Sequence, residues 1–107
     1  MRYTVRFAPE ALEQLAALED YISQAGSPTV GARYVDAIVT YCMSLAAFPL
    51  RGTARDEIMP ALRVTNYRGR CIVAFEVDNA QRIVSILGVY YGGENYETLL
   101  KGQPPSR

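Results

Sequence analysis

The chain has 107 residues, of which 50% are hydrophobic and 21% are charged, a composition typical of one globular domain and not of a disordered or fibrous protein. Eleven basic and eleven acidic residues cancel, which argues against a protein held on nucleic acid by its overall charge. The absence of histidine excludes imidazole metal ligands and Ser-His-Asp or Cys-His catalysis.

The two cysteines, Cys42 and Cys71, are far apart in sequence and form no CxxC pair. We expect them to be buried thiols in a reducing cytoplasm. Residues 1–7 lack the apolar core of a signal peptide, and no apolar run approaches the length of about 18 residues that a membrane span needs. The sequence therefore predicts a cytoplasmic protein without membrane contact.

The first half of the chain is expected to hold one strand and two helices. Residues 1–7 alternate polar and apolar side chains, which predicts a short strand with one buried face. Apolar residues recur at helical spacing from Pro9 to Gly26 and again from Pro28 to Phe48. Proline suits the first turn of a helix and glycine its end, so the sequence predicts two helices in an antiparallel hairpin.

The second half is expected to form an antiparallel sheet. An irregular loop from Pro49 to Pro60 comes first. Three strands follow, at residues 62–67, 71–77 and 82–91. The last strand is nearly all apolar, so we expect it in the middle of the sheet, buried on both faces. Residues 94–100 favour one or two helical turns.

These elements predict an α+β fold in the order β-α-α-β-β-β(-α), with the helical hairpin packed on a small antiparallel sheet. We expect a single domain over residues 1–101. The remaining residues, 102–107, contain two prolines and a glycine and are expected to be a flexible tail that is dispensable for folding.

Charge is unevenly distributed along this neutral chain. Residues 1–48 contain three basic and five acidic side chains, whereas residues 49–71 contain five arginines against Asp56 and Glu57. The helical hairpin is therefore expected to be acidic, and the loop and following strand to form a basic edge. Arginine suits the recognition of anions or of an acidic partner, although charge on a strand edge also serves simply to prevent aggregation. The arginines of this edge are Arg51, Arg55, Arg63, Arg68 and Arg70.

Tyrosines accompany this basic edge. Alternation along residues 62–67 places Arg63 and Tyr67 on one face, which we expect to be open if the helices cover the other. Tyr90 and Tyr91 end the central strand and must point to opposite faces. Tyrosine and arginine together are good contact residues for a protein partner or for stacked bases, and ordinary half-buried packing is the alternative. The candidate contact tyrosines are Tyr67, Tyr91 and Tyr96.

Ribonuclease chemistry is poorly supported by the residue types present. Metal-free RNA cleavage needs one group to take the 2′-hydroxyl proton and another to protonate the leaving oxygen. Asp56 and Glu57 are merely neighbours in a loop, and arginine and tyrosine start from very high pKa values. We therefore expect no catalytic residues, no metal and no cofactor.

Seven segments follow one another in a distinctive order and spacing: residues 3–11 (YTVRFAPEA), 20–22 (DYI), 48–52 (FPLRG), 55–58 (RDEI), 62–64 (LRV), 72–78 (IVAFEVD) and 86–93 (ILGVYYGG). In these segments, along nearly its whole length, the chain resembles the RelE/ParE superfamily of bacterial type II toxins. The resemblance implies the same α+β fold that the element order predicts.

Within the superfamily the chain is most similar to the ParE branch. The RelE ribonucleases cut messenger RNA in the ribosomal A site with basic residues and a tyrosine. In this chain the arginine that the ribonucleases have near the position of Tyr90 and Tyr91 is missing, and Ile72 occupies the position of a second catalytic arginine. Tyr96 is the one residue that matches the ribonuclease site, at the position of its tyrosine. The resemblance thus implies a non-enzymatic toxin that traps DNA gyrase on cleaved DNA. The alternatives are a RelE-like endoribonuclease and a degenerate toxin that only binds its antitoxin.

The resemblance also implies a ParD-like antitoxin. Its N-terminal part would be a ribbon-helix-helix DNA-binding dimer, and its C-terminal segment would fold onto an apolar groove or a sheet edge of the toxin. DNA contact would come only through the antitoxin, and plasmid stabilisation is the implied role. We expect Arg63→Ala to lower toxicity without unfolding the chain. The residues predicted to contact target or antitoxin are Arg63, Tyr67, Tyr91 and Tyr96, with Arg51, Arg55 and Arg70.

Overall fold

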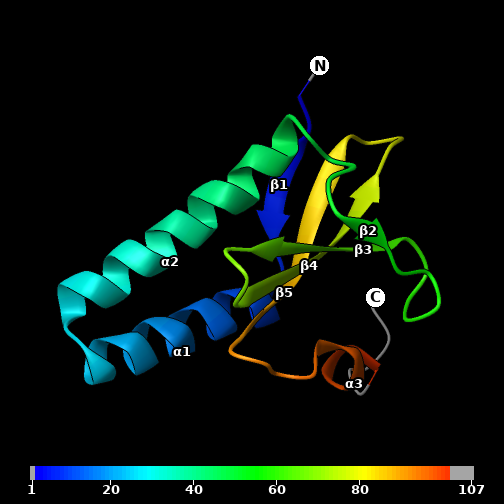
Figure 1. Cartoon of the computed structure of the whole chain (residues 1–107). Coiled ribbons are helices and arrows are strands. Elements are labelled where there is room, and N and C mark those ends of the chain that lie inside the picture. Colours follow the sequence, from blue (N-terminus) through cyan, green and yellow to red (C-terminus); the bar gives the residue numbers. More distant parts are fainter. Residues whose placement is uncertain (1, 102–107) are drawn as a thin grey trace.

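A computed structural model describes residues 2–101 of the chain (Figure 1). The predicted tail, residues 102–107, lies outside the described residues, so the division after residue 101 stays a prediction. The elements in chain order are β1 (Thr4–Phe7), α1 (Pro9–Ala25), α2 (Pro28–Met43), the 3₁₀ turn η1 (Ser44–Ala46), β2 (Thr53–Ala54), β3 (Leu62–Tyr67), β4 (Cys71–Asp78), β5 (Ile83–Tyr91) and α3 (Tyr96–Lys101).

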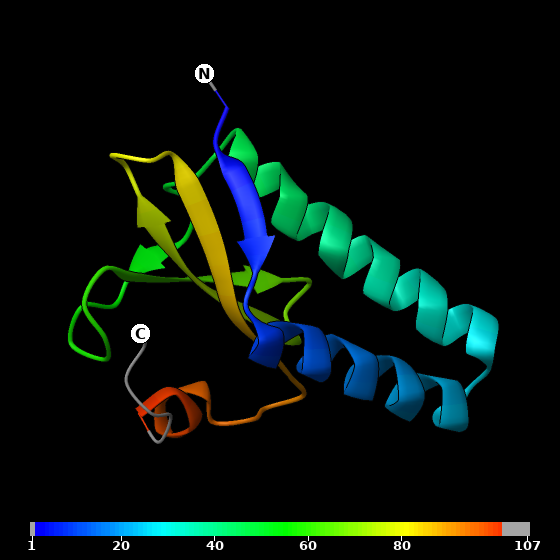
Figure 2. The ribbon, with the colours of Figure 1, turned by 180° about the vertical axis from the view of Figure 1, so that it is seen from behind.

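The five strands form one sheet in the order β1-β5-β4-β3-β2. β1 runs parallel to β5, and the other neighbours are antiparallel. The α1–α2 hairpin packs on one face of the sheet and projects beyond it, as Figures 1 and 2 show from opposite sides. The predicted α+β fold and the interior place of β5 are thus confirmed.

Local sequence signals explain the hairpin. Pro28 opens α2, and the Ser27 hydroxyl oxygen accepts a hydrogen bond from the Val30 amide at 3.3 Å. α2 ends at Met43, five residues before the predicted end at Phe48, because the chain tightens there into the 3₁₀ turn η1.

A close helix crossing fixes how the hairpin packs. Gly31 of α2 is buried, and a Cβ atom at this position would lie 2.8 Å from the carbonyl oxygen of Glu19 in α1. Glycine therefore allows the two backbones to approach more closely than any larger residue permits.

The first hydrophobic core lies between the hairpin and the sheet. Its fully buried residues include Ile38 and Cys42 of α2, Phe75 of β4 and Ile86 of β5. Cys42 and Cys71 are both buried and free, as predicted. Burial raises the pKa of Cys42 to about 12, with a smaller contribution from Cys71, and raises the pKa of Cys71 to about 11. Both thiols are therefore protonated and unreactive at neutral pH.

A second, smaller core covers the opposite face of the sheet. Leu62, Ala74 and Tyr90 of the sheet are buried there against Leu100 of α3. A register shift between Ala74 and Phe75 accompanies the change of pairing partner on β5, from Gly88 to Ile86. The expectation of an open second face is therefore wrong near β3, because α3 and the loop before β3 cover it.

No helix within residues 2–101 is both long enough and apolar enough to cross a membrane.

Candidate functional site

A row of aromatic rings lies where the ends of three strands meet α2. Cys71 of β4 pairs with Tyr67 of β3 on one side and with Tyr91 of β5 on the other. α2 brings two further tyrosines to these rings, seven residues apart and so on one helix face. The ring centroids of Tyr41 and Tyr67 are 5.0 Å apart, and those of Tyr34 and Tyr91 are 5.7 Å apart.

This row corrects the predicted position of Tyr67. Tyr67 does not lie on an open face with Arg63 but under the hairpin, where it packs against the first core. The neighbouring Thr65 is also buried on this side, and its hydroxyl shares a hydrogen bond of 2.7 Å with the Tyr41 hydroxyl. The opposite face of β3, which carries Leu62 and Val64, packs instead in the second core.

A cleft of about 390 Å³ opens beside this row, between α1 and the end of β5. Leu18 and Val89 supply apolar lining, and Tyr21 and Tyr91 form an aromatic wall with ring centroids 6.4 Å apart. The guanidinium of Arg70 lies 5.6 Å from the Tyr91 ring centroid. Among residues 2–101, Arg70 has no carboxylate partner, so its donors are free for an anionic ligand.

The walls of this cleft are tied to the sheet backbone. The Gln14 side-chain oxygen accepts a hydrogen bond from the Val89 amide at 2.7 Å, and Glu94 accepts one from the Tyr91 amide at 2.9 Å. Gln14 thereby connects α1 to β5, and Glu94 fixes the turn that leaves β5. The cleft is therefore formed before any ligand arrives.

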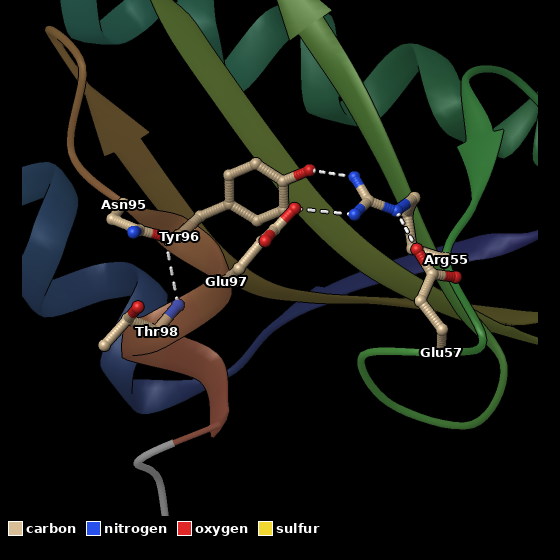
Figure 3. Close-up of polar contacts among 6 residues, drawn as sticks. All are labelled: Arg55, Glu57, Asn95, Tyr96, Glu97 and Thr98. Atoms are coloured by element: carbon tan, nitrogen blue, oxygen red, sulfur yellow. Dashed lines mark hydrogen bonds and ion pairs between the residues drawn. The ribbon is translucent and has the colours of Figure 1, made fainter.

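Arg55 is the centre of a separate cluster that connects the loop before β3 to α3 (Figure 3). Its guanidinium donates to Glu57 at 2.5 Å, to Glu97 at 2.6 Å and to the Tyr96 hydroxyl. Hydrogen bonds to Glu57 and then to Glu97 raise the pKa of Arg55 further above its ordinary value. Arg55 is thus a permanent cation whose single charge is more than offset by two carboxylates.

The chemistry available near Tyr96 is limited by this cluster. The Tyr96 hydroxyl is engaged by Arg55, and the adjoining hollow contains Val64 and Ile72 from the sheet, which supply no acid or base. No group of three or more histidine, cysteine or acidic side chains among residues 2–101 is placed to hold a metal ion. The arrangement fastens α3 to the loop before β3.

Arg63 and Arg51 hold a third region, the loop formed by Phe48–Gly52. The guanidinium of Arg63 donates to three carbonyl oxygens of this loop, those of Leu50, Arg51 and Gly52, at 2.6, 3.2 and 3.1 Å. Arg51 lies over the rings of Tyr41 and Phe48.

The seven residues predicted for the site therefore fall into three groups, which adjoin one another because Arg51 of the loop lies over Tyr41 of the aromatic row and one hollow is lined by both Gly52 and Arg55. Tyr67, Tyr91 and Arg70 belong to the aromatic row and its cleft, Arg55 and Tyr96 to the α3 cluster, and Arg51 and Arg63 to the loop Phe48–Gly52. Sequence reasoning missed the helical tyrosines Tyr21, Tyr34 and Tyr41. The seven-residue spacing of the last two was the available signal.

Comparison with known proteins agrees with this fold. The family model of the ParE toxin of the type II toxin-antitoxin system parDE matches residues 5–96. The chain therefore belongs to the ParE toxin family, within the RelE/ParE superfamily that the sequence motifs indicated. A search of curated proteins finds no match.

Three solved structures show the shared fold at low sequence identity. A chain of the chromosomal ParDE system of Pseudomonas aeruginosa is 21% identical with a TM-score of 0.71, over 85% of this chain and 97% of that one. A chain of the RelBE2 toxin-antitoxin complex of Mycobacterium tuberculosis is 24% identical with a TM-score of 0.63, and the match covers 85% of this chain and 99% of that one. A free mutant of the Escherichia coli toxin RelE is 14% identical with a TM-score of 0.67, and the match covers 94% of this chain and 95% of that one.

Proposed function

We propose that this toxin acts in the cytoplasm as a ParE-like inhibitor of DNA gyrase, without catalysing a reaction itself, and that a ParD-like antitoxin neutralises it. The observation that carries the proposal is the match of the ParE family model to residues 5–96. The fold alone would not decide the target, because ParE and RelE structures are both similar to this chain.

The chemistry around Tyr96 supports a binding role over ribonuclease activity. A ribonuclease needs a proton acceptor and cations that are free to hold the scissile phosphate. Here the nearest cation, Arg55, is paired with Glu57 and Glu97 and engages the Tyr96 hydroxyl. A phosphate would have to displace two carboxylates to reach this guanidinium.

The cleft between α1 and β5 supports the antitoxin part of the proposal. Its apolar lining suits one face of an amphipathic helix, and Arg70 offers an unpaired cation at its side. An antitoxin segment with apolar residues at helical spacing and a nearby carboxylate would fit both features. Binding of such a segment would shield this surface from other partners.

The target class is tested by following macromolecular synthesis after the toxin is induced in bacteria. We expect incorporation of labelled thymidine into DNA to stop well before incorporation of labelled methionine into protein. Co-expression of the antitoxin encoded beside the toxin gene should restore both. Protein synthesis that stops first, with cleaved messenger RNA, would overturn the gyrase proposal in favour of a RelE-like ribonuclease.

A further inference from the structure

The loop Phe48–Gly52 begins with a tight turn that its sequence prescribes. The Arg51 amide donates to the Phe48 carbonyl at 3.2 Å, which closes a four-residue turn with Pro49 in its second position. Proline presets the backbone angle that this position requires. Gly52 follows with φ +82°, where a side chain would be strained and a Cβ atom would meet the Val64 backbone.

Two large apolar side chains project from this turn into solvent. Phe48 is 57% exposed and Leu50 is 65% exposed, the highest value among the large hydrophobic residues that the structure describes. Together with Pro49 and Arg51 they border a shallow hollow of about 430 Å³. Exposed apolar groups of this kind mark interaction surfaces when the backbone beneath them is held rigid.

The backbone here is held from two sides. Arg63 binds the carbonyl oxygens of Leu50, Arg51 and Gly52, and Arg51 donates to the Ser44 hydroxyl at 3.3 Å. Three carbonyl oxygens on one guanidinium leave the turn little freedom to collapse onto the core. The fold therefore stabilises the exposure of Phe48 and Leu50 instead of burying them.

We propose that the loop Phe48–Gly52 is the surface by which this toxin contacts its folded protein target, an inference that rests on the proposed function. The partner surface it fits presents an apolar side chain to the hollow, with carboxylates around it. The carboxylates are indicated by charge, because neither Arg51 nor Arg63 has an acidic partner among residues 2–101.

A folded target fits this loop better than an antitoxin helix does. Within the described part of the chain, residues 2–101, the hollow is bordered by four consecutive residues of one turn, 48–51, and by no second segment along which a helix would lie. A docked helix needs anchors about two turns apart, roughly 10 Å along its axis. The cleft beside α1 is lined along that helix from Gln14 to Tyr21, which is about 10 Å at 1.5 Å per residue, so target and antitoxin would use different surfaces.

The test compares Leu50→Ala and the double variant Phe48→Ala/Leu50→Ala with Leu12→Ala. Leu12 is a matched control because it is an exposed leucine, at 54%, on α1 away from the loop. For each variant we would measure growth arrest on expression, inhibition of gyrase supercoiling, affinity for the antitoxin and melting temperature. The wild-type chain is assayed in parallel in every experiment.

We expect the loop variants to need about tenfold more toxin, or more, for growth arrest and gyrase inhibition, as truncation of a central contact residue typically does. Antitoxin affinity and melting temperature should stay close to those of wild type, and Leu12→Ala should behave as wild type. Equal toxicity of the double variant and wild type would overturn the proposal. So would a parallel loss of antitoxin affinity, which would assign the loop to the antitoxin.

Failure of the proposed function is distinguishable from failure of this inference. If wild type arrests growth without inhibiting gyrase, the target is wrong, and the loss of growth arrest in the loop variants alone still supports the loop as a target contact. If wild type inhibits gyrase and the loop variants inhibit it equally, the target stands and the loop is excluded. A wild-type chain without toxicity would overturn both.

Discussion

The guanidinium groups of Arg51, Arg63 and Arg70 lie against aromatic rings or carbonyl oxygens, and none has a carboxylate partner among residues 2–101. Arginine can stack on a ring with one face and still donate hydrogen bonds from its edge. These three side chains therefore shape the surface and leave positive charge available to an acidic partner. Arg55 leaves no such charge available, because Glu57 and Glu97 already pair with it.

Removal of Arg63 tests its role as a support for the loop. Arg63→Ala deletes three hydrogen bonds to carbonyl oxygens, so the bond between Arg51 and Gly52 should become accessible to trypsin. We expect severalfold faster cleavage at this bond and reduced toxicity, with a cooperative melting transition retained. Arg68→Ala, which removes an exposed arginine from the β3–β4 turn, is the control. Unchanged cleavage and unchanged growth arrest would remove Arg63 from this role.

The buried thiols predict an alkaline loss of stability. Their pKa values in the fold, about 12 for Cys42 and about 11 for Cys71, exceed the ordinary value of 9.0. Above pH 9 the unfolded chain releases these protons and the folded chain keeps them, so the free energy of unfolding should fall as pH rises. The fall approaches at most about 1.4 kcal/mol per pH unit for each thiol.

Chemical denaturation between pH 8.5 and 9.5 measures this effect, because the thiols of the unfolded chain lose their protons in that window. The comparison is with Cys42→Ala/Cys71→Ala, which is expected to be less stable at pH 7 because of the cavities. Its stability should nevertheless depend less on pH. Parallel pH profiles for the two proteins would show that the thiols do not control the alkaline limit.

The packing of the hairpin depends on the close approach of α1 and α2 at Gly31. Alanine favours helix over glycine by about 1 kcal/mol, so propensity alone predicts that Gly31→Ala stabilises α2. The carbonyl oxygen of Glu19, 2.8 Å from the added Cβ, opposes this because a backbone atom cannot move aside cheaply. We expect overpacking to cost about 1–3 kcal/mol, so that the net change after the gain in propensity is a loss of up to about 2 kcal/mol in unfolding free energy.

Gly26→Ala is the control for this prediction. Gly26 lies just after α1, and its Cβ would meet only the Ile22 carbonyl at an ordinary 3.5 Å. Its effect on stability should therefore be the smaller of the two. A Gly31→Ala protein as stable as wild type in urea denaturation would mean that the helices separate easily and that the crossing is not a constraint.

The attachment of α3 depends on the hydrogen bonds that Arg55 makes to this helix. Arg55→Gln keeps some hydrogen-bonding capacity but loses the charge that binds Glu97 and Glu57. We expect faster amide hydrogen exchange in α3, with the protection of β4 and β5 unchanged, because the apolar contacts of Leu100 and Tyr96 must then hold the helix on the second core without the ion pairs. Equal exchange in α3 would show that apolar contact suffices.

The sequence was enough to predict the hairpin, the three long strands and the last helix, because their periodicities and prolines are local signals. It did not reveal β2, a two-residue strand formed only by pairing with β3. Nor could alternation along residues 62–67 show which face the hairpin covers. That choice depends on Leu62 meeting Leu100 of α3, a contact between distant parts of the chain.

In the folded molecule, the arginines that were predicted to form one basic edge lie in different groups of contacts. The aromatic cleft lies beside α1 at the end of β5. The Arg55 cluster joins the loop before β3 to α3 (Figure 3). The loop Phe48–Gly52 forms a third place. The seven site residues were predicted as contacts of target or antitoxin, and their distribution over three groups followed only from the strand order and from the contacts of each side chain.

Inhibition of gyrase by direct binding, the function proposed above, can be tested with purified components. The most direct test is a supercoiling and DNA-cleavage assay with purified gyrase, into which the isolated folded chain is titrated. We expect loss of supercoiling with accumulation of cleaved DNA, reversed by the antitoxin encoded beside the toxin. Full supercoiling activity in the presence of folded toxin that still binds its antitoxin would contradict it.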